Sequence, residues 1–278
     1  MLVSLCKQVV GILGLVWIVC VPLSAWQQDK YLSEGGVEIK KGVDLLFKGV
    51  DALETHHDRQ AFTYFKQSHQ HGSILGTTFL GIVYMEGRGT APDYYLAKSY
   101  FDSALRQLRV LLKANSAEEE LATGSTPIQN FDTSIIANYG LATMIQQGLG
   151  MPKDPEKALH MYREIIVALG ANGATAVLRK TSNGPRYQGE LSVITDSVLD
   201  LVTAMPFKHV IDLKLLKASY YSNNKIAKEY VGKTLYQIGM AYKMGIGTGK
   251  KRGKAKKFLE KAVEFGNEEA MQALEGLE

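Results

Sequence analysis

Apolar residues recur at helical spacing along most of the chain. Leu75, Phe79, Ile82 and Val83 stand one, three or four positions apart, which places them on one face of a helix. After a short polar stretch the same spacing resumes, at Ala97, Tyr100, Phe101, Ala104 and Leu105. Two helices joined by a short turn lie antiparallel, so the pattern predicts a helical hairpin.

The hairpin pattern occurs three times. The chain reads LGIVYMEGRGTAPDYYLAKSYFDSA at 80–104, LATMIQQGLGMPKDPEKALHMYREI at 141–165 and IGMAYKMGIGTGKKRGKAKKFLEKA at 238–262. The segments align without gaps and share a G-x-G corner, with an alanine eight residues after the second glycine. The shared positions are Gly87, Gly89, Ala97, Gly148, Gly150, Ala158, Gly245, Gly247 and Ala255. Such self-similarity is the signature of a repeat architecture.

The G-x-G corner ends one helix and prepares the next. Glycine adopts the left-handed conformation that follows the last turn of many helices without a Cβ clash. Asp93 and Asp154 then stand where the second helix should begin, where an aspartate accepts hydrogen bonds from free backbone N–H groups. The third copy has Lys251 at this position, so we expect its helix to lack the cap.

Weaker copies extend the array at both ends. Residues 56–72 resemble a second helix, because their alanine and glycine have the same eleven-residue spacing as Ala255 and Gly266. Residues 37–54 would form the first helix of that pair. Residues 266–274 would begin a further first helix that caps the array.

The repeats are unevenly spaced, which predicts two helical insertions. Against a unit of about 36 residues, Gly87 and Gly148 are 61 residues apart, and Gly148 and Gly245 are 97 apart. We expect the helix in the first insertion to reach about residue 122. The second insertion should hold helices on either side of Pro206, at 190–205 and 207–221. The clear repeats cover about 72–105, 134–169 and 231–266, and the insertions about 106–133 and 171–224.

The first 25 residues have the layout of a secretory signal peptide. Lys7 is the only charge in the first 28 residues, and an apolar run at 9–25 ends with Ala25 at the candidate cleavage site. We therefore expect an exported protein, periplasmic or secreted. The alternative is that the apolar run at 9–25 remains as a membrane anchor.

The N-terminal segment leaves a linker and one repeat domain in the rest of the chain. Residues 26–36 are expected to be a linker, and 37–278 the repeat domain. Both cysteines, Cys6 and Cys20, lie in the N-terminal segment. A cleaved chain would have no disulfide and would depend on packing alone.

The repeated residues resemble the signature of the Sel-one-like repeat, a relative of the tetratricopeptide repeat. The first copy matches at Leu80, Gly81, Tyr84, Gly87, Gly89, Asp93 and Ala97. The second keeps Leu141, Gly148, Gly150, Asp154 and Ala158, and the third keeps Gly239, Tyr242, Gly245, Gly247 and Ala255. The resemblance implies an all-α fold, a right-handed α-solenoid of antiparallel helix pairs. It also implies an adaptor that holds other proteins, of which exported bacterial members occur.

The composition and the motifs of the chain indicate neither a cofactor site nor a metal site. The segment MGIGTGKKRG at 244–253 resembles a phosphate loop, but that loop would need glycine at Met244 and serine or threonine at Lys251. His57 and His69 lie at opposite ends of one predicted helix, roughly 18 Å apart, and cannot share a metal. A net charge of +4 is too small to indicate nucleic acid as a partner.

One charge cluster departs from the ordinary composition. The segment KKRGKAKK at 250–257 places six cations at the start of a predicted helix, where the helix dipole disfavours them. They form either a solvated face or a surface for an anionic partner such as an acidic protein, a lipid headgroup or a glycan. The six residues are Lys250, Lys251, Arg252, Lys254, Lys256 and Lys257.

Three functional hypotheses follow. The first is a non-catalytic scaffold that binds a protein or peptide on the concave face of the array, where we place Thr77, Thr78, Met144, Gln146 and Gln237. The second is an envelope protein that binds an anionic surface through the basic cluster; it contacts the membrane itself only if the N-terminal segment is uncleaved. The third is a cell-wall-modifying enzyme with carboxylates from the second insertion, at Asp196, Asp200 and Asp212.

Overall fold

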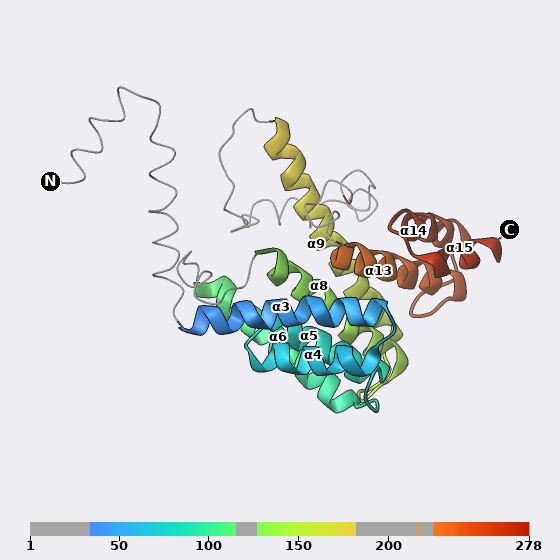
Figure 1. The fold of residues 1–278 in the computed structure, drawn as a ribbon. Coiled ribbons are helices and arrows are strands. Elements are labelled where there is room, and N and C mark those ends of the chain that lie inside the picture. The colour runs from blue at the N-terminus through green and yellow to red at the C-terminus, as the bar shows by residue number, and fades with distance from the viewer. Residues whose placement is uncertain (1–33, 115–126, 182–215, 217–224, 278) are drawn as a thin grey trace, which may run out of the picture.

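The computed structural model describes residues 34–114, 127–181, 216 and 225–277, and every structural statement below concerns these residues (Figure 1). All regular structure in this part is helical. The helices are α3 (Glu34–Glu54), α4 (Asp58–Gln70), α5 (Ile74–Glu86), α6 (Tyr94–Ala114), α8 (Pro127–Gln147), α9 (Pro155–Thr181), α13 (Lys225–Met244), α14 (Arg252–Glu264) and α15 (Glu268–Glu275).

Consecutive helices pack as hairpins that stack in chain order. The pairs are α3 with α4, α5 with α6, α8 with α9, and α13 with α14; α15 then packs on α14 and α13. Each first helix also contacts the first and second helices of the preceding pair. The predicted fold class, an all-α solenoid of antiparallel helix pairs, is confirmed.

The two helices of each pair have different neighbours. First helices touch one another along the array, whereas the described second helices mainly touch their own partner and the next first helix. A stack curves toward the layer in which its members approach most closely. The first helices α3, α5, α8, α13 and α15 therefore form the inner layer, and the second helices form the outer layer.

The three G-x-G corners share one backbone geometry. The first glycines, Gly87, Gly148 and Gly245, have φ of +70°, +79° and +78°, in the left-handed region that suits glycine. Each of these corners is also closed by a hydrogen bond that spans nine residues of sequence. It runs from the N–H of the residue before the second helix to a carbonyl oxygen near the end of the first helix. The bonds are Asp93 to Tyr84 (3.0 Å), Asp154 to Ile145 (2.9 Å) and Lys251 to Tyr242 (2.9 Å).

The second glycine of each corner packs on the preceding hairpin. A Cβ atom on Gly89 would lie 2.1 Å from the carbonyl oxygen of Asp58, the first residue of α4. A Cβ on Gly247 would lie 2.2 Å from the carbonyl oxygen of Pro155, the first residue of α9. At Gly150 the atom nearest to a built Cβ is the Cβ of Tyr94, the first residue of α6, at 2.8 Å. These glycines therefore let each hairpin approach the start of the preceding second helix closely, and two of them meet its backbone.

Arg88, between the glycines of the first corner, strengthens this contact. Its guanidinium donates to the carboxylate of Asp58 at 2.7 Å and to the carbonyl oxygen of Leu53 at 2.9 Å. Both acceptors belong to the preceding hairpin, so the side chain joins two repeats. The first corner thus contributes a polar contact in addition to the close backbone approach.

Aspartates cap two of the second helices, as predicted. The Asp93 carboxylate accepts a 2.9 Å hydrogen bond from the N–H of Leu96, and Asp154 accepts one of 2.9 Å from Lys157. Lys251 occupies the same position before α14, and its side chain makes no capping bond. The expectation that the third copy lacks a cap is confirmed.

The opposite ends of the hairpins use a second kind of turn. Gly72 and Gly266 have φ of +80° and +83° between a second helix and the next first helix. Ser73 and Asn267 follow them and accept hydrogen bonds from the N–H groups of Gly76 and Ala270. The weaker copies therefore have the expected helices, α3 with α4 before the clear repeats and α15 after them.

Glycines inside the helices make room for large core side chains. Phe101 of α6 is fully buried between Gly81 of its own hairpin and Gly140 of the next. A Cβ atom on either glycine would lie within 2.7 Å of the phenylalanine ring. One aromatic ring thus ties α6 to both α5 and α8, and through them to the continuous core.

Several expectations lie outside the described residues. These are the N-terminal segment 1–25, most of the linker 26–36, the helix extension from 115 to 122 and most of the insertion at 171–224. The described parts show α3 beginning at Glu34 and α9 continuing to Thr181. No helix within the described ranges is long and apolar enough to span a bilayer.

The stacking role of the second glycine predicts that Gly89→Ala destabilises the protein. The new methyl group would meet a backbone carbonyl and would also place alanine at φ +75°. We expect a loss on the order of 1–3 kcal/mol in the free energy of unfolding, measured with urea. Gly249→Ala is the matched control, because a Cβ there meets nothing within 4 Å. Equal stability of the two variants would contradict the stacking role.

The missing cap predicts that Lys251→Asp stabilises the protein. An aspartate would accept a hydrogen bond at the start of α14, as Asp93 and Asp154 do in their hairpins, and would suit the helix dipole. We expect a gain of about 1 kcal/mol at low ionic strength. Lys256→Asp makes the same charge change at an exposed position within α14. If both variants shift the urea midpoint equally, general charge relief explains the gain and capping does not.

Candidate binding surfaces

The inner layer draws three first helices together around Tyr230 of α13. The Tyr230 ring lies 6.4 Å from the ring of Phe79 on α5 and 5.4 Å from the ring of Tyr139 on α8, both edge to face. Tyr230 is buried. The fourth hairpin therefore reaches back to the second one across the inner layer, in addition to packing on its neighbour.

Charged groups surround this aromatic contact. The Lys233 ammonium lies 4.7 Å from the centre of the Tyr230 ring and forms a 2.6 Å ion pair with Glu229 one turn earlier. Glu86, at the end of α5, is close enough to interact electrostatically with Lys233. We call the group Glu86, Tyr139, Lys233 and Gln237 the inner-face cluster.

The pKa values of the inner-face cluster reflect the packing around each group. Desolvation raises the pKa of Glu86, although its side chain keeps exposed surface and the nearby cations of Lys233 and Arg88 oppose the change. For Lys233, burial acts to lower the pKa, but the carboxylates of Glu229 and Glu86 outweigh it and the pKa is raised. Burial also raises the pKa of the Tyr139 hydroxyl. The cluster therefore presents a lysine that stays charged beside a carboxyl group that holds its proton more tightly than usual.

Tyrosine hydroxyls lie beside the two glutamines of the inner layer. Thr143 and Gln237 are near enough to the Tyr139 hydroxyl to act against the increase in its pKa. The Tyr162 hydroxyl lies 3.0 Å from the Thr143 hydroxyl and donates to the Gln146 side-chain oxygen at 3.1 Å. Gln146 and Gln237 are only half-buried. Both residues thus lie on the inner layer, and the Tyr162 hydroxyl holds the amide group of Gln146.

The other three residues placed on the concave face belong to the core. Thr77, Thr78 and Met144 are 2%, 0% and 0% exposed, which corrects the expectation that a partner reaches them. Thr77 bonds to His69 and to the Ser73 carbonyl oxygen, at 2.8 and 2.9 Å. The physical reason is the curvature of the stack, because α5 lies against α3, α4, α6 and α8 and also meets Tyr230.

The basic cluster forms an exposed patch at the start of α14. All six of its residues are exposed, and the Lys254 ammonium lies 5.2 Å from the centre of the Tyr242 ring. We keep the name basic patch for the six residues Lys250, Lys251, Arg252, Lys254, Lys256 and Lys257. Their exposure agrees with both earlier interpretations of the cluster, a solvated face or an anion-binding surface.

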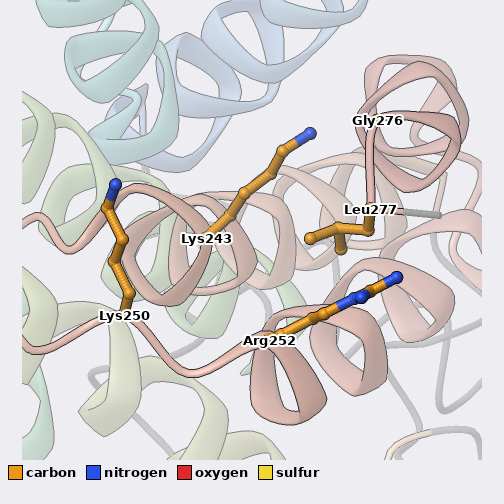
Figure 2. Close-up of a pocket in the computed structure, with 5 residues that line it drawn as sticks. All are labelled: Lys243, Lys250, Arg252, Gly276 and Leu277. Atoms are coloured by element: carbon orange, nitrogen blue, oxygen red, sulfur yellow. The ribbon is translucent and has the colours of Figure 1, made fainter.

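A hollow of about 500 Å³ lies beside the basic patch (Figure 2). Lys243 reaches it from the end of α13, Lys250 from the corner and Arg252 from the start of α14, while Gly276 and Leu277 close the side nearest α15. The Lys243 ammonium also donates to the Ala273 carbonyl oxygen at 2.7 Å. Three cations from separate positions therefore line one depression.

Within the described ranges, the His, Cys, Asp and Glu residues form no group of three that would hold a metal ion. The glycines Gly245 and Gly247 of the phosphate-loop-like segment have φ of +78° and +65° and belong to the corner. The three aspartates considered for an enzyme, Asp196, Asp200 and Asp212, lie outside the described residues.

Sequence reasoning did not find Glu86, Tyr139, Lys233 or Tyr230. In the repeat alignment Tyr230 falls at the position of Gly72, so nothing local marks it as an inter-helix contact. Its role depends on how far the array curves between α5 and α13. Lys243 was missed for a similar reason, since α15 and the corner that complete its hollow come from other parts of the repeat.

The architecture is that of an all-α repeat protein, and comparison with known proteins identifies the repeat. A family model for the Sel1 repeat matches residues 75–107, 135–165 and 233–267. The chain therefore carries three Sel1 repeats, and such repeats commonly mediate protein–protein interactions. A search of proteins with curated functions found no match.

Two solved structures are similar to the chain. One is the crystal structure of a Sel1 repeat protein from Oxalobacter formigenes, at 16% identity and a TM-score of 0.34, covering 84% of this chain and 76% of the other. The second is c5321, described as a protective antigen of uropathogenic Escherichia coli strains with an SLR fold, at 18% identity and a TM-score of 0.22. That match covers 84% of this chain, which spans 63% of the length of c5321.

The raised pKa of Glu86 predicts a pH-dependent gain from Glu86→Gln. A carboxyl group with a raised pKa in the folded state contributes stability below its unfolded pKa, and this is lost as pH rises through the folded pKa. The variant should therefore gain stability relative to the parent between about pH 4 and pH 7, and the gain should vanish at lower pH. Urea unfolding across this range measures it. Glu260→Gln, at an exposed position on α14, should show no such trend.

Proposed function

We propose that this protein is an exported, non-catalytic scaffold that holds a partner protein or peptide on the inner layer of its repeats. The proposal joins a family role in protein interaction to the arrangement of this particular surface. It includes export to the periplasm or beyond, on the basis of the signal-like residues 1–25, with a membrane anchor at 9–25 as the alternative.

The inner-face cluster is the observation that carries the proposal. It combines an accessible lysine, carboxyl group and glutamine on α5 and α13, above the buried Tyr139 of α8. Polar groups held in place by neighbours lose little entropy when a partner binds. An extended segment lying across α5 and α13 would find Glu86 on one helix and Lys233 and Gln237 on the other.

Site-specific crosslinking tests the proposal. A photoreactive amino acid at Gln237 should form a discrete protein adduct in the native cell, because this residue lies on the inner layer. The adduct should weaken when Lys233→Glu reverses the cluster's charge. Gln107 is the matched control, since it is an exposed glutamine on α6 of the outer layer.

Two outcomes would count against the scaffold. Adducts of the same size and yield at Gln107 and Gln237 would indicate unspecific contact. No protein adduct at Gln237, with the protein at its native level, would show that the inner layer is not a docking surface.

A further inference from the structure

Five lysines of the basic patch carry charge that no ion pair with a described residue balances. Lys250, Lys251, Lys254, Lys256 and Lys257 have no ion pair with any described residue. In contrast, Lys98 and Lys233 each form an ion pair one helical turn away, with Asp102 and Glu229. Clustered like charges repel one another, so an anion bound beside the patch would reduce the electrostatic repulsion among its lysines.

Two glycines leave the backbone of this region uncovered. Gly249 and Gly253 have neither a left-handed φ nor any atom within 4 Å of a built Cβ. Neither the turn nor the packing therefore requires glycine there, unlike Gly245 and Gly247. Gly253 also lies in the first turn of α14, where glycine costs about 1 kcal/mol relative to alanine. Their lack of side chains lets a ligand approach the main chain between Lys250 and Lys254.

The hollow lies among three of the cations of this region. Its volume of about 500 Å³ admits a small charged group and part of what is attached to it, and it is lined by Lys243, Lys250 and Arg252, whose side chains extend in different directions (Figure 2). The surrounding lysines raise the positive potential at its mouth. This is an arrangement of cations in three dimensions, beyond a run of basic residues in the sequence.

We propose that the hollow formed by Lys243, Lys250 and Arg252 binds a phosphate group, carried either by a lipid headgroup or by a soluble phosphate ester. Phosphate offers several acceptor oxygens and one or two negative charges, which suits donors placed at separate points around a hollow. The lysines of the patch act as compact point charges, a mode of binding suited to phosphate. This site is separate from the inner-face cluster and does not depend on the scaffold function.

An acidic peptide fits the hollow less well. Peptide interfaces depend on buried aromatic or aliphatic anchors. The only large apolar side chain lining the hollow is Leu277, and the exposed positions at 249–254 are glycine, lysine and arginine. The chemistry of this surface is electrostatic, with little area for apolar contact.

Binding measurements on the full chain test the proposal in two arms. One arm compares vesicles of phosphatidylglycerol in phosphatidylcholine with vesicles of phosphatidylcholine alone. The other measures thermal stabilisation by inorganic phosphate and by glycerol phosphate, against chloride at equal ionic strength. The triple variant Lys243→Gln, Lys250→Gln, Arg252→Gln should bind the phosphate probe at least about tenfold more weakly.

The control variant removes the same number of positive charges as the triple variant, but from a surface remote in sequence from the hollow. Lys40→Gln, Lys41→Gln, Lys48→Gln removes three exposed cations from α3 and should change binding less than about twofold. Any insertion of the apolar residues 9–25 is common to both vesicle types and cancels in the comparison. The double variant Lys250→Gln, Arg252→Gln retains the contact of Lys243 with Ala273 and guards against loss of folding.

The outcomes distinguish a lipid headgroup from a soluble phosphate ester, and they also include results that would overturn the proposal. Hollow-dependent binding to phosphatidylglycerol alone identifies a lipid headgroup, and hollow-dependent stabilisation by soluble phosphate identifies a phosphate ester. Equal losses in the hollow and α3 variants would overturn the proposal, as would no binding in either arm. Tighter binding of polyglutamate than of either phosphate probe would also overturn it, in favour of an acidic protein.

Discussion

The structure depends on a close backbone contact between successive hairpins. The second glycine of each G-x-G corner meets the first residue of the preceding second helix, at Asp58, Tyr94 and Pro155 in turn. A side chain at the glycine would hold the hairpins apart at one end only and so change the angle at which they stack. The same small residue therefore terminates a helix locally and sets the curvature of the whole array.

That curvature creates the inner-face cluster. Because the first helices approach one another closely, Tyr230 of the fourth hairpin touches both Phe79 and Tyr139. The charged residues beside these rings are brought from α5 and α13, which belong to non-adjacent repeats. No single hairpin contains the cluster, so its geometry responds to any change in stacking between α5 and α13.

The sequence predicted the features that depend on neighbouring residues along the chain. It did not predict the features that depend on how the hairpins stack. Helix pairs, corners and the caps at Asp93 and Asp154 follow from spacing and from the conformations that glycine and aspartate favour. Thr77 and Met144 looked accessible because the repeat pattern identifies a helix but not how many neighbours surround it. Gln146 and Gln237 lie on first helices and are half-buried, yet the tyrosine that holds the Gln146 amide could be known only from the packed structure.

The fourth hairpin departs from the second and third in a consistent direction. Where they have an aspartate that stabilises the start of the second helix, it has Lys251, followed by Arg252 and by a glycine that packing does not require. Each difference weakens α14 as an isolated helix, and each also makes its start more positive or more open. The corner itself keeps the shared backbone geometry, so the repeat tolerates these changes. Stability given up at one helix start, in a hairpin that otherwise follows the pattern, is best explained by an anionic ligand that restores the missing negative charge.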